Sequence, residues 1–74
     1  MKLASSALES AVYDRATEEL IVEFVEGGMY GYSGVPEQVY RSLVSSSSPG
    51  RFFNLEIRDR YPCRKLPLKS GYLS

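Results

Sequence analysis

The chain has 74 residues, which leaves room for one small domain with a modest hydrophobic core and no large enclosed active site. Apolar residues make up 43% of the chain, as in a globular protein, but their runs are far shorter than the ~20 residues that cross a bilayer. No apolar signal segment follows Met1, and Cys63, the single cysteine, excludes an intramolecular disulfide, so we expect a cytoplasmic protein without a membrane partner.

The formal net charge is zero, but the two halves of the chain carry opposite charge. Residues 1–40 hold two basic and seven acidic side chains, whereas residues 41–74 hold seven basic and two acidic ones. Such asymmetry indicates either an anionic partner for the basic half or ion pairs between the two halves of one fold. Composition alone leaves both interpretations open.

Three strands are predicted in the first half of the chain. Residues 8–13 alternate weakly and end at side chains that suit a turn. Residues 19–25 alternate clearly, and the glycines at 27 and 28 then allow the chain to reverse into a strand over residues 29–33. Short turns between successive strands predict an antiparallel meander, whose core-facing residues in the second strand are Leu20, Val22 and Phe24.

Two short helices are expected to follow. Pro36 suits the first turn of a helix over residues 36–44, and the serines at 45–48 end it. Ser48 and Pro49 then suit the start of a second helix, from residue 49 to about residue 58. Because a three-stranded sheet needs cover on one face, we predict an α+β fold, a three-stranded antiparallel meander followed by two short helices packed on one face. Residues from Cys63 onward are expected to form an extended tail.

The residue types argue against catalysis. The chain has no histidine, so Ser-His-Asp and Cys-His nucleophile systems cannot be built. One cysteine cannot form a zinc site, and the glycines do not match a phosphate-binding loop. We therefore expect no enzyme activity, no metal and no cofactor. Cys63 stands near Arg60 and Arg64, which would favour the thiolate, but we expect a partly buried thiol with no redox role.

Several spaced motifs together resemble those of the KTSC family, over Ser5 to about Leu66. They are Tyr13-Asp14, Gly28-x-Tyr30-x-Tyr32-x-x-Val35-Pro36 and Phe52-Phe53-Asn54-x-x-Ile57-Arg58-x-x-Tyr61-Pro62. The family is named after a module at the C-terminus of some lysyl-tRNA synthetases and also occurs as small stand-alone bacterial and phage proteins. The resemblance implies a KTSC-like domain over residues 5–66, a tail over 67–74, and an uncharacterised function for which RNA binding has been suggested. This chain departs from the family pattern at Val12, where glycine is common, and at Cys63, where an aromatic often follows Tyr-Pro.

Tyr30 and Tyr32 are the main candidates for binding, because side chains at i and i+2 of a strand point to the same side. If exposed, the two rings could stack on bases while arginines attract phosphates. If buried, they would pack beneath a helix with Phe24 and Phe53, and a sequence pI near 6.2 does not favour a dedicated nucleic-acid binder. The predicted RNA-binding set is Tyr30, Tyr32, Arg51, Asn54, Arg58, Arg60 and Arg64.

A protein-interaction module is the alternative hypothesis. The open edge of a meander can accept an added strand, and Ile21 and Val25 are expected to point outward from the sheet. Such a module of a bacterial or phage protein would dock on a partner protein or self-associate into a homo-oligomer.

Overall fold

Alternating apolar and polar residues in the first half of the chain produce three antiparallel strands, as predicted. They are β1 (Leu8–Asp14), β2 (Glu19–Phe24) and β3 (Met29–Tyr32) in a computed structural model that describes residue 3 and residues 6–66. Leu20 of β2 lies opposite Tyr13 of β1 and Tyr32 of β3. The turn between β2 and β3 places Gly27 at φ +110°, a conformation that glycine adopts at no steric cost.

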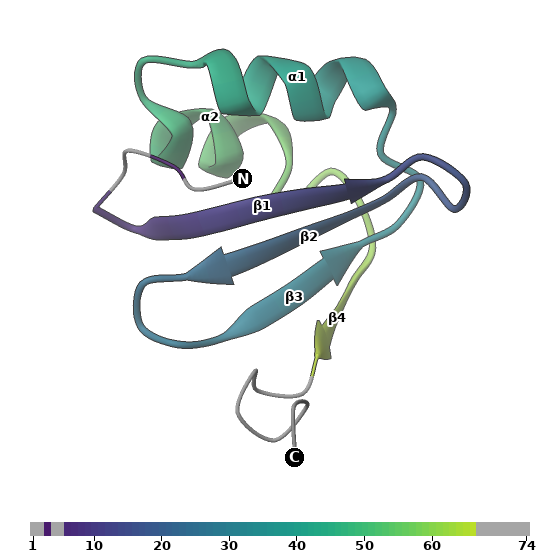
Figure 1. Cartoon of the computed structure of the whole chain (residues 1–74), viewed down its shortest axis with the longest axis horizontal. Helices are drawn as coiled ribbons and strands as arrows, with labels where there is room; N and C mark the ends of the chain where they lie inside the picture. The colour runs from purple at the N-terminus through teal and green to yellow at the C-terminus, as the bar shows by residue number, and fades with distance from the viewer. Residues whose placement is uncertain (1–2, 4–5, 67–74) are drawn as a thin grey trace.

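A fourth strand, β4 (Cys63–Leu66), pairs antiparallel with β3 and completes a sheet of order β1-β2-β3-β4 (Figure 1). The Ser33 amide donates to the Pro62 carbonyl at 2.9 Å, immediately before this pairing begins. The α+β fold is therefore confirmed with four strands in place of the predicted three. The prediction that an extended tail begins at Cys63 was wrong for residues 63–66, and the tail predicted over 67–74 lies outside the described residues.

The helices α1 (Glu37–Ser45) and α2 (Pro49–Glu56) agree with the predicted spans to within two residues at each end. Both lie on the same side of the sheet (Figure 1). Pro36 is extended and immediately precedes α1, whereas Pro49 occupies the start of α2 after Ser48. Pro49 thus takes the position where its missing N–H costs no hydrogen bond.

Tyr13 attaches the start of α1 to the sheet. Its ring stacks on that of Tyr40 at a centroid distance of 5.3 Å, and its hydroxyl donates to the Val35 carbonyl at 2.5 Å. Desolvation, followed by the nearby carboxylates of Glu18 and Glu37, raises the pKa of the Tyr13 phenol. The phenol therefore stays protonated and remains a donor at neutral pH.

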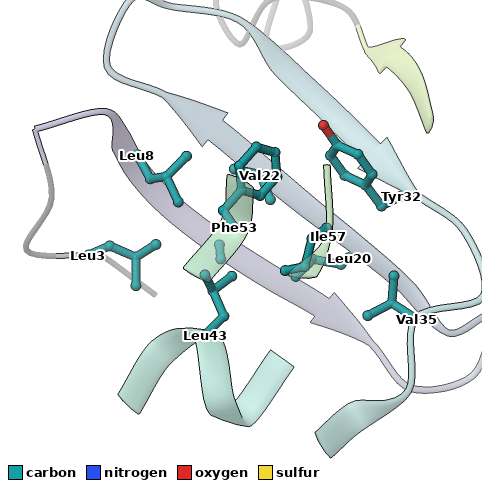
Figure 2. Packing of buried hydrophobic residues seen from close by; sticks show 10 residues of the cluster. Leu3, Leu8, Leu20, Val22, Tyr32, Val35, Leu43, Phe53 and Ile57 are labelled. Atoms are coloured by element: carbon teal, nitrogen blue, oxygen red, sulfur yellow. The ribbon is translucent and has the colours of Figure 1, made fainter. Parts of the chain in front are cut away.

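The core lies between the inner face of the sheet and the two helices. Leu20 and Val22 are fully buried, as predicted, whereas Phe24 is half-buried at the margin of the core. From the helical side, Leu43 of α1, Phe53 of α2 and Ile57 pack on the strands; Figure 2 shows them with Leu3, Leu8, Tyr32 and Val35.

No described element covers the outer face of the sheet. Val12 on this face is 53% exposed, and its neighbour in the register, Ile21, is half-buried. A side chain on the inner face can therefore contact the core and the helices, whereas a side chain on the outer face cannot.

Candidate functional site

The helices leave part of the inner face of the sheet open. An open hollow of about 740 Å³ lies among the β2–β3 hairpin, Cys63 of β4, and α2 with the turn that follows it. We call it the main hollow. Its aromatic lining is Phe24, Tyr30, Tyr32 and Phe53, and its polar side chains are Glu26, Asn54, Arg58, Asp59 and Cys63.

The four aromatic rings form a continuous series of edge-to-face contacts. Phe24 meets Tyr30 and Phe53 at centroid distances of 5.5 Å, and Phe53 meets Tyr32 at 5.4 Å. Aromatic pairs favour this arrangement because the positive edge of one ring faces the negative face of the next. Tyr32 is 4% exposed, so its ring belongs to the core, whereas Tyr30 is half-buried and keeps exposed surface in the hollow.

Of the two candidate tyrosines, only Tyr30 therefore keeps exposed ring surface. Tyr32 is buried and packs on Phe53, as expected for tyrosines that belong to the core. Tyr30 combines both roles, because it contacts Phe24 and also lines the hollow. A base can stack only on accessible ring surface, so Tyr32 offers none.

Gly28 fixes the position of the Tyr30 ring. A Cβ at residue 28 would lie 3.3 Å from Cε1 of Tyr30, tighter than ordinary van der Waals contact. The ring therefore lies against the backbone of the turn before β3, and a Cβ at position 28 would require it to move by a few tenths of an ångström. The sequence motif Gly28-x-Tyr30 has this physical reason.

The Tyr32 hydroxyl lies beside the Cys63 thiol. These residues are opposite each other in the pairing of β3 with β4, so their side chains lie on the same face of the sheet. Burial, followed by the neighbouring thiol, raises the pKa of Tyr32 to about 12, although Arg58 acts in the opposite direction. The phenol is thus neutral throughout the physiological range, and Cys63 itself is exposed at the hollow.

The predicted cations do not all line one hollow. Arg58 lines the main hollow, and Arg51 lines a second hollow of about 510 Å³ near the start of α2. Asn54 lines both. Arg60 lines neither hollow, and its Nε donates to the Leu55 carbonyl at 3.3 Å.

Arg64 lies on the outer face of the sheet. It pairs with Gly31, which continues the row of Val12 and Ile21, whereas Cys63 and Lys65 pair with the inward-pointing tyrosines. Its guanidinium forms an ion pair with Glu19 at 3.0 Å. Inclusion of Arg64 in one surface with Tyr30 was therefore wrong, because the sheet separates the two side chains.

Gly31 leaves room for the Glu19–Arg64 pair. Glu19 is on β2 and Arg64 on β4, so the carboxylate must cross β3 to reach its partner. A Cβ at residue 31 would lie only 2.5 Å from Glu19 Oε2. This pair joins the acidic and basic halves of the chain at a separation of 45 residues. Part of the sequence asymmetry thus serves the fold.

Sequence reasoning missed Glu26, Asp59 and Cys63 as lining residues of the main hollow. The helical spacing of Asn54 and Arg58 indicated one wall, but Cys63 joins the hollow only because β4 pairs with β3. Among the described residues, no group of three or more His, Cys, Asp or Glu side chains is placed to hold a metal ion. In the same part of the chain, no helix is long and apolar enough to cross a membrane.

Comparison with known proteins identifies the family. A KTSC domain model matches residues 4–61. The crystal structure of a KTSC domain protein from Yersinia pestis superposes with a TM-score of 0.88 at 37% identity, covering 90% of this chain and 94% of that one. A protein of Tsukamurella paurometabola is 40% identical over 57 residues, which are 77% of this chain and 85% of that protein.

A longer relative contains a similar segment. A lysine–tRNA ligase of Nostoc punctiforme is 30% identical over 66 residues, which are 89% of this chain but 12% of the ligase. The similarity to the ligase is thus confined to a small part of that enzyme. On the family match and the close structural likeness, the chain belongs to the KTSC domain family.

Proposed function

We propose that this KTSC domain is a small non-catalytic module that binds single-stranded RNA at the main hollow. The observation that carries the proposal is the meeting of three kinds of group around one open surface. Tyr30 supplies ring surface, Asn54 an amide and Arg58 a guanidinium. The proposed site is smaller than the one predicted from the sequence, because Tyr32, Arg60 and Arg64 are engaged elsewhere.

Each group matches one part of a nucleotide. Stacking of a base on an aromatic ring is worth about 1–3 kcal/mol. The Asn54 amide can donate to and accept from a base edge, and the Arg58 guanidinium can pair with a phosphate. Arg58 makes no ion pair with the described residues, so its charge is free to meet an anion.

The acidic residues of the main hollow limit the affinity and direct the orientation of the ligand. The carboxylates of Glu26 and Asp59 repel phosphates but accept hydrogen bonds from the amino groups of a base. We therefore expect the base to enter beside these carboxylates, with its phosphate next to Arg58. One cation against two carboxylates also favours a weak complex, and its salt dependence should be shallow because the slope grows with the number of phosphates that are neutralised.

The comparisons support RNA as the ligand class. A segment similar to this chain occurs in a lysine–tRNA ligase, a protein named for its action on tRNA. Because the segment is 12% of that ligase, aminoacylation is no part of the proposal. The proposal of a non-catalytic role rests on the chain's lack of histidine, the usual general base at neutral pH.

Two arginine substitutions on opposite faces of the sheet test the proposal. Fluorescence anisotropy would follow binding of a labelled, mixed-sequence 12-nucleotide single-stranded RNA at low and high salt. We expect tighter binding at low salt, and about threefold to tenfold weaker binding for Arg58→Gln. Arg64→Gln removes the same charge from the outer face and should bind nearly as the wild type does, once circular dichroism confirms its fold.

Equal effects of the two substitutions, or no binding at either salt concentration, would contradict the proposal. Absence of RNA binding together with a dimer in light scattering would instead favour the protein-interaction hypothesis. That outcome would direct attention to the outer sheet face around Val12 and Ile21.

A further inference from the structure

The two hollows along α2 are adjacent parts of one groove. Ser6, Ala7 and Asn54 line both the main hollow and the second one. The second hollow continues past Asn54 to Arg51 and the serines that precede α2. The groove thus runs along the helix, from Arg51 at one end to Tyr30 at the other.

Arg51, Asn54 and Arg58 follow one side of this segment at positions i, i+3 and i+7. From Arg51 to the end of α2 at Glu56 the helix rises roughly 8 Å, and Arg58 lies in the turn beyond, so the two arginines serve the groove from separate places. At 3.4 Å per step, this rise together with the turn matches two to three steps of a stacked nucleic-acid strand.

The two ends of the groove also differ in charge. The main hollow contains Glu26 and Asp59 beside Arg58, whereas the lining of the second hollow contains Arg51 and no carboxylate. Neither arginine forms an ion pair with any described residue. Phosphates are therefore favoured toward Arg51, and a base is favoured at the Tyr30 end.

Building on the proposed function, we infer that the groove holds a run of about three or four nucleotides of single-stranded RNA. A base is bound at the Tyr30 end, and the sugar-phosphate chain extends past Asn54 to Arg51. In this arrangement Arg51 contacts only ligands that are long enough to reach it, whereas Arg58 contacts every ligand that enters the main hollow.

A length series tests the inference. Uridine monophosphate and oligouridylates of two, four and six nucleotides would compete with the labelled 12-nucleotide RNA for the full chain. We expect affinity to rise up to about four nucleotides and then to level off. Arg51→Gln should weaken the four-nucleotide competitor by about threefold to tenfold and leave the mononucleotide unchanged, whereas Arg58→Gln should weaken both.

Arg60→Gln is the matched control, because it removes one positive charge close to Arg58 from a side chain outside both hollows. It should leave all four competitors nearly unchanged. Suppose that RNA binds and that Arg58→Gln weakens the binding, but that Arg51→Gln and Arg60→Gln bind the four-nucleotide competitor equally well. The extended groove is then refuted, while the proposed function stands. If the labelled RNA does not bind and no competitor shows binding, the proposed function itself fails.

Discussion

Phe53 is the residue on which both the core and the main hollow depend, so its replacement by leucine is a sensitive test of the structure. The side chain is 3% exposed and meets Phe24 and Tyr32 edge to face. Leucine keeps the site apolar but removes both ring contacts. Because Tyr30 packs on Phe24 in turn, loss of the Phe53 ring should also loosen the aromatic wall of the hollow.

The cost can be estimated from these contacts. Two edge-to-face pairs at about 0.5–1.5 kcal/mol each give roughly 1–3 kcal/mol, and imperfect filling of the space left by the ring adds to it. A domain of this length has a free energy of unfolding of about 4–11 kcal/mol. Phe53→Leu should therefore remain folded, with a Tm lower by about 4–24 °C. Phe53→Ala, at about 3–5 kcal/mol, would leave too little stability for a clean comparison.

Urea unfolding followed by circular dichroism, together with a thermal melt, would measure the loss. Leu55→Ala is the control, because Leu55 is on the same helix and 57% exposed, and its change should stay within about 0.5 kcal/mol. A Tm for Phe53→Leu within about 3 °C of the wild type, or equal losses for the two variants, would refute the packing described for α2.

Three further experiments test single contacts. In a double-mutant cycle, Arg64→Gln should cost about 0.5–1 kcal/mol in the wild type but almost nothing in Gly31→Ala, because the new Cβ already displaces the Glu19 carboxylate. Tyr13→Phe should lower the midpoint of urea unfolding, since it loses the phenol's hydrogen bond to the loop carbonyl before α1. Denaturant titrations at pH 9 to 12 should show that the wild type loses stability as the pH rises. Tyr32→Phe should lose less stability over the same range.

The sign of the alkaline effect follows from the pKa of Tyr32 in the two states. Below pH 10, the ordinary phenol pKa, Tyr32 is protonated whether the chain is folded or unfolded, and its contribution does not change with pH. Between pH 10 and about 12 the unfolded chain ionises while the folded chain does not, so stability falls as pH rises. The slope from one group is at most about 1.4 kcal/mol per pH unit. Identical pH profiles for wild type and Tyr32→Phe would contradict the burial of this phenol.

Local patterns predicted most of the secondary structure because they reflect local physics. Leu20 and Val22 are two positions apart in β2, so both lie on the inner face while the residues between and beside them lie on the outer face. Gly27 permits the turn that follows. The strand β4 could not be predicted in this way. Three of the four residues in Cys63–Leu66 are exposed, so no apolar alternation marks them, and their conformation depends on pairing with β3.

The candidate site was only partly predictable for the same reason. The spacing of Tyr30 and Tyr32 correctly places both on one face, but contact with Phe53 makes Tyr32 a core residue, and that contact depends on tertiary packing. Arg64 was grouped with Arg58 because the two are close in sequence. Its position on the outer face follows from strand alternation, which applies only once β4 is known to be a strand.

The most direct test of the account is to map where RNA contacts the domain. A titration of ¹⁵N-labelled protein with a four-nucleotide single-stranded RNA, followed by NMR chemical shifts, would report on both sheet faces at once. The account predicts shifts concentrated at Ala7, Gly28, Asn54 and Arg58 along the groove, with little change at Val12 on the outer face. Shifts centred on Val12 and its outer-face neighbours, with the groove unperturbed, would contradict it.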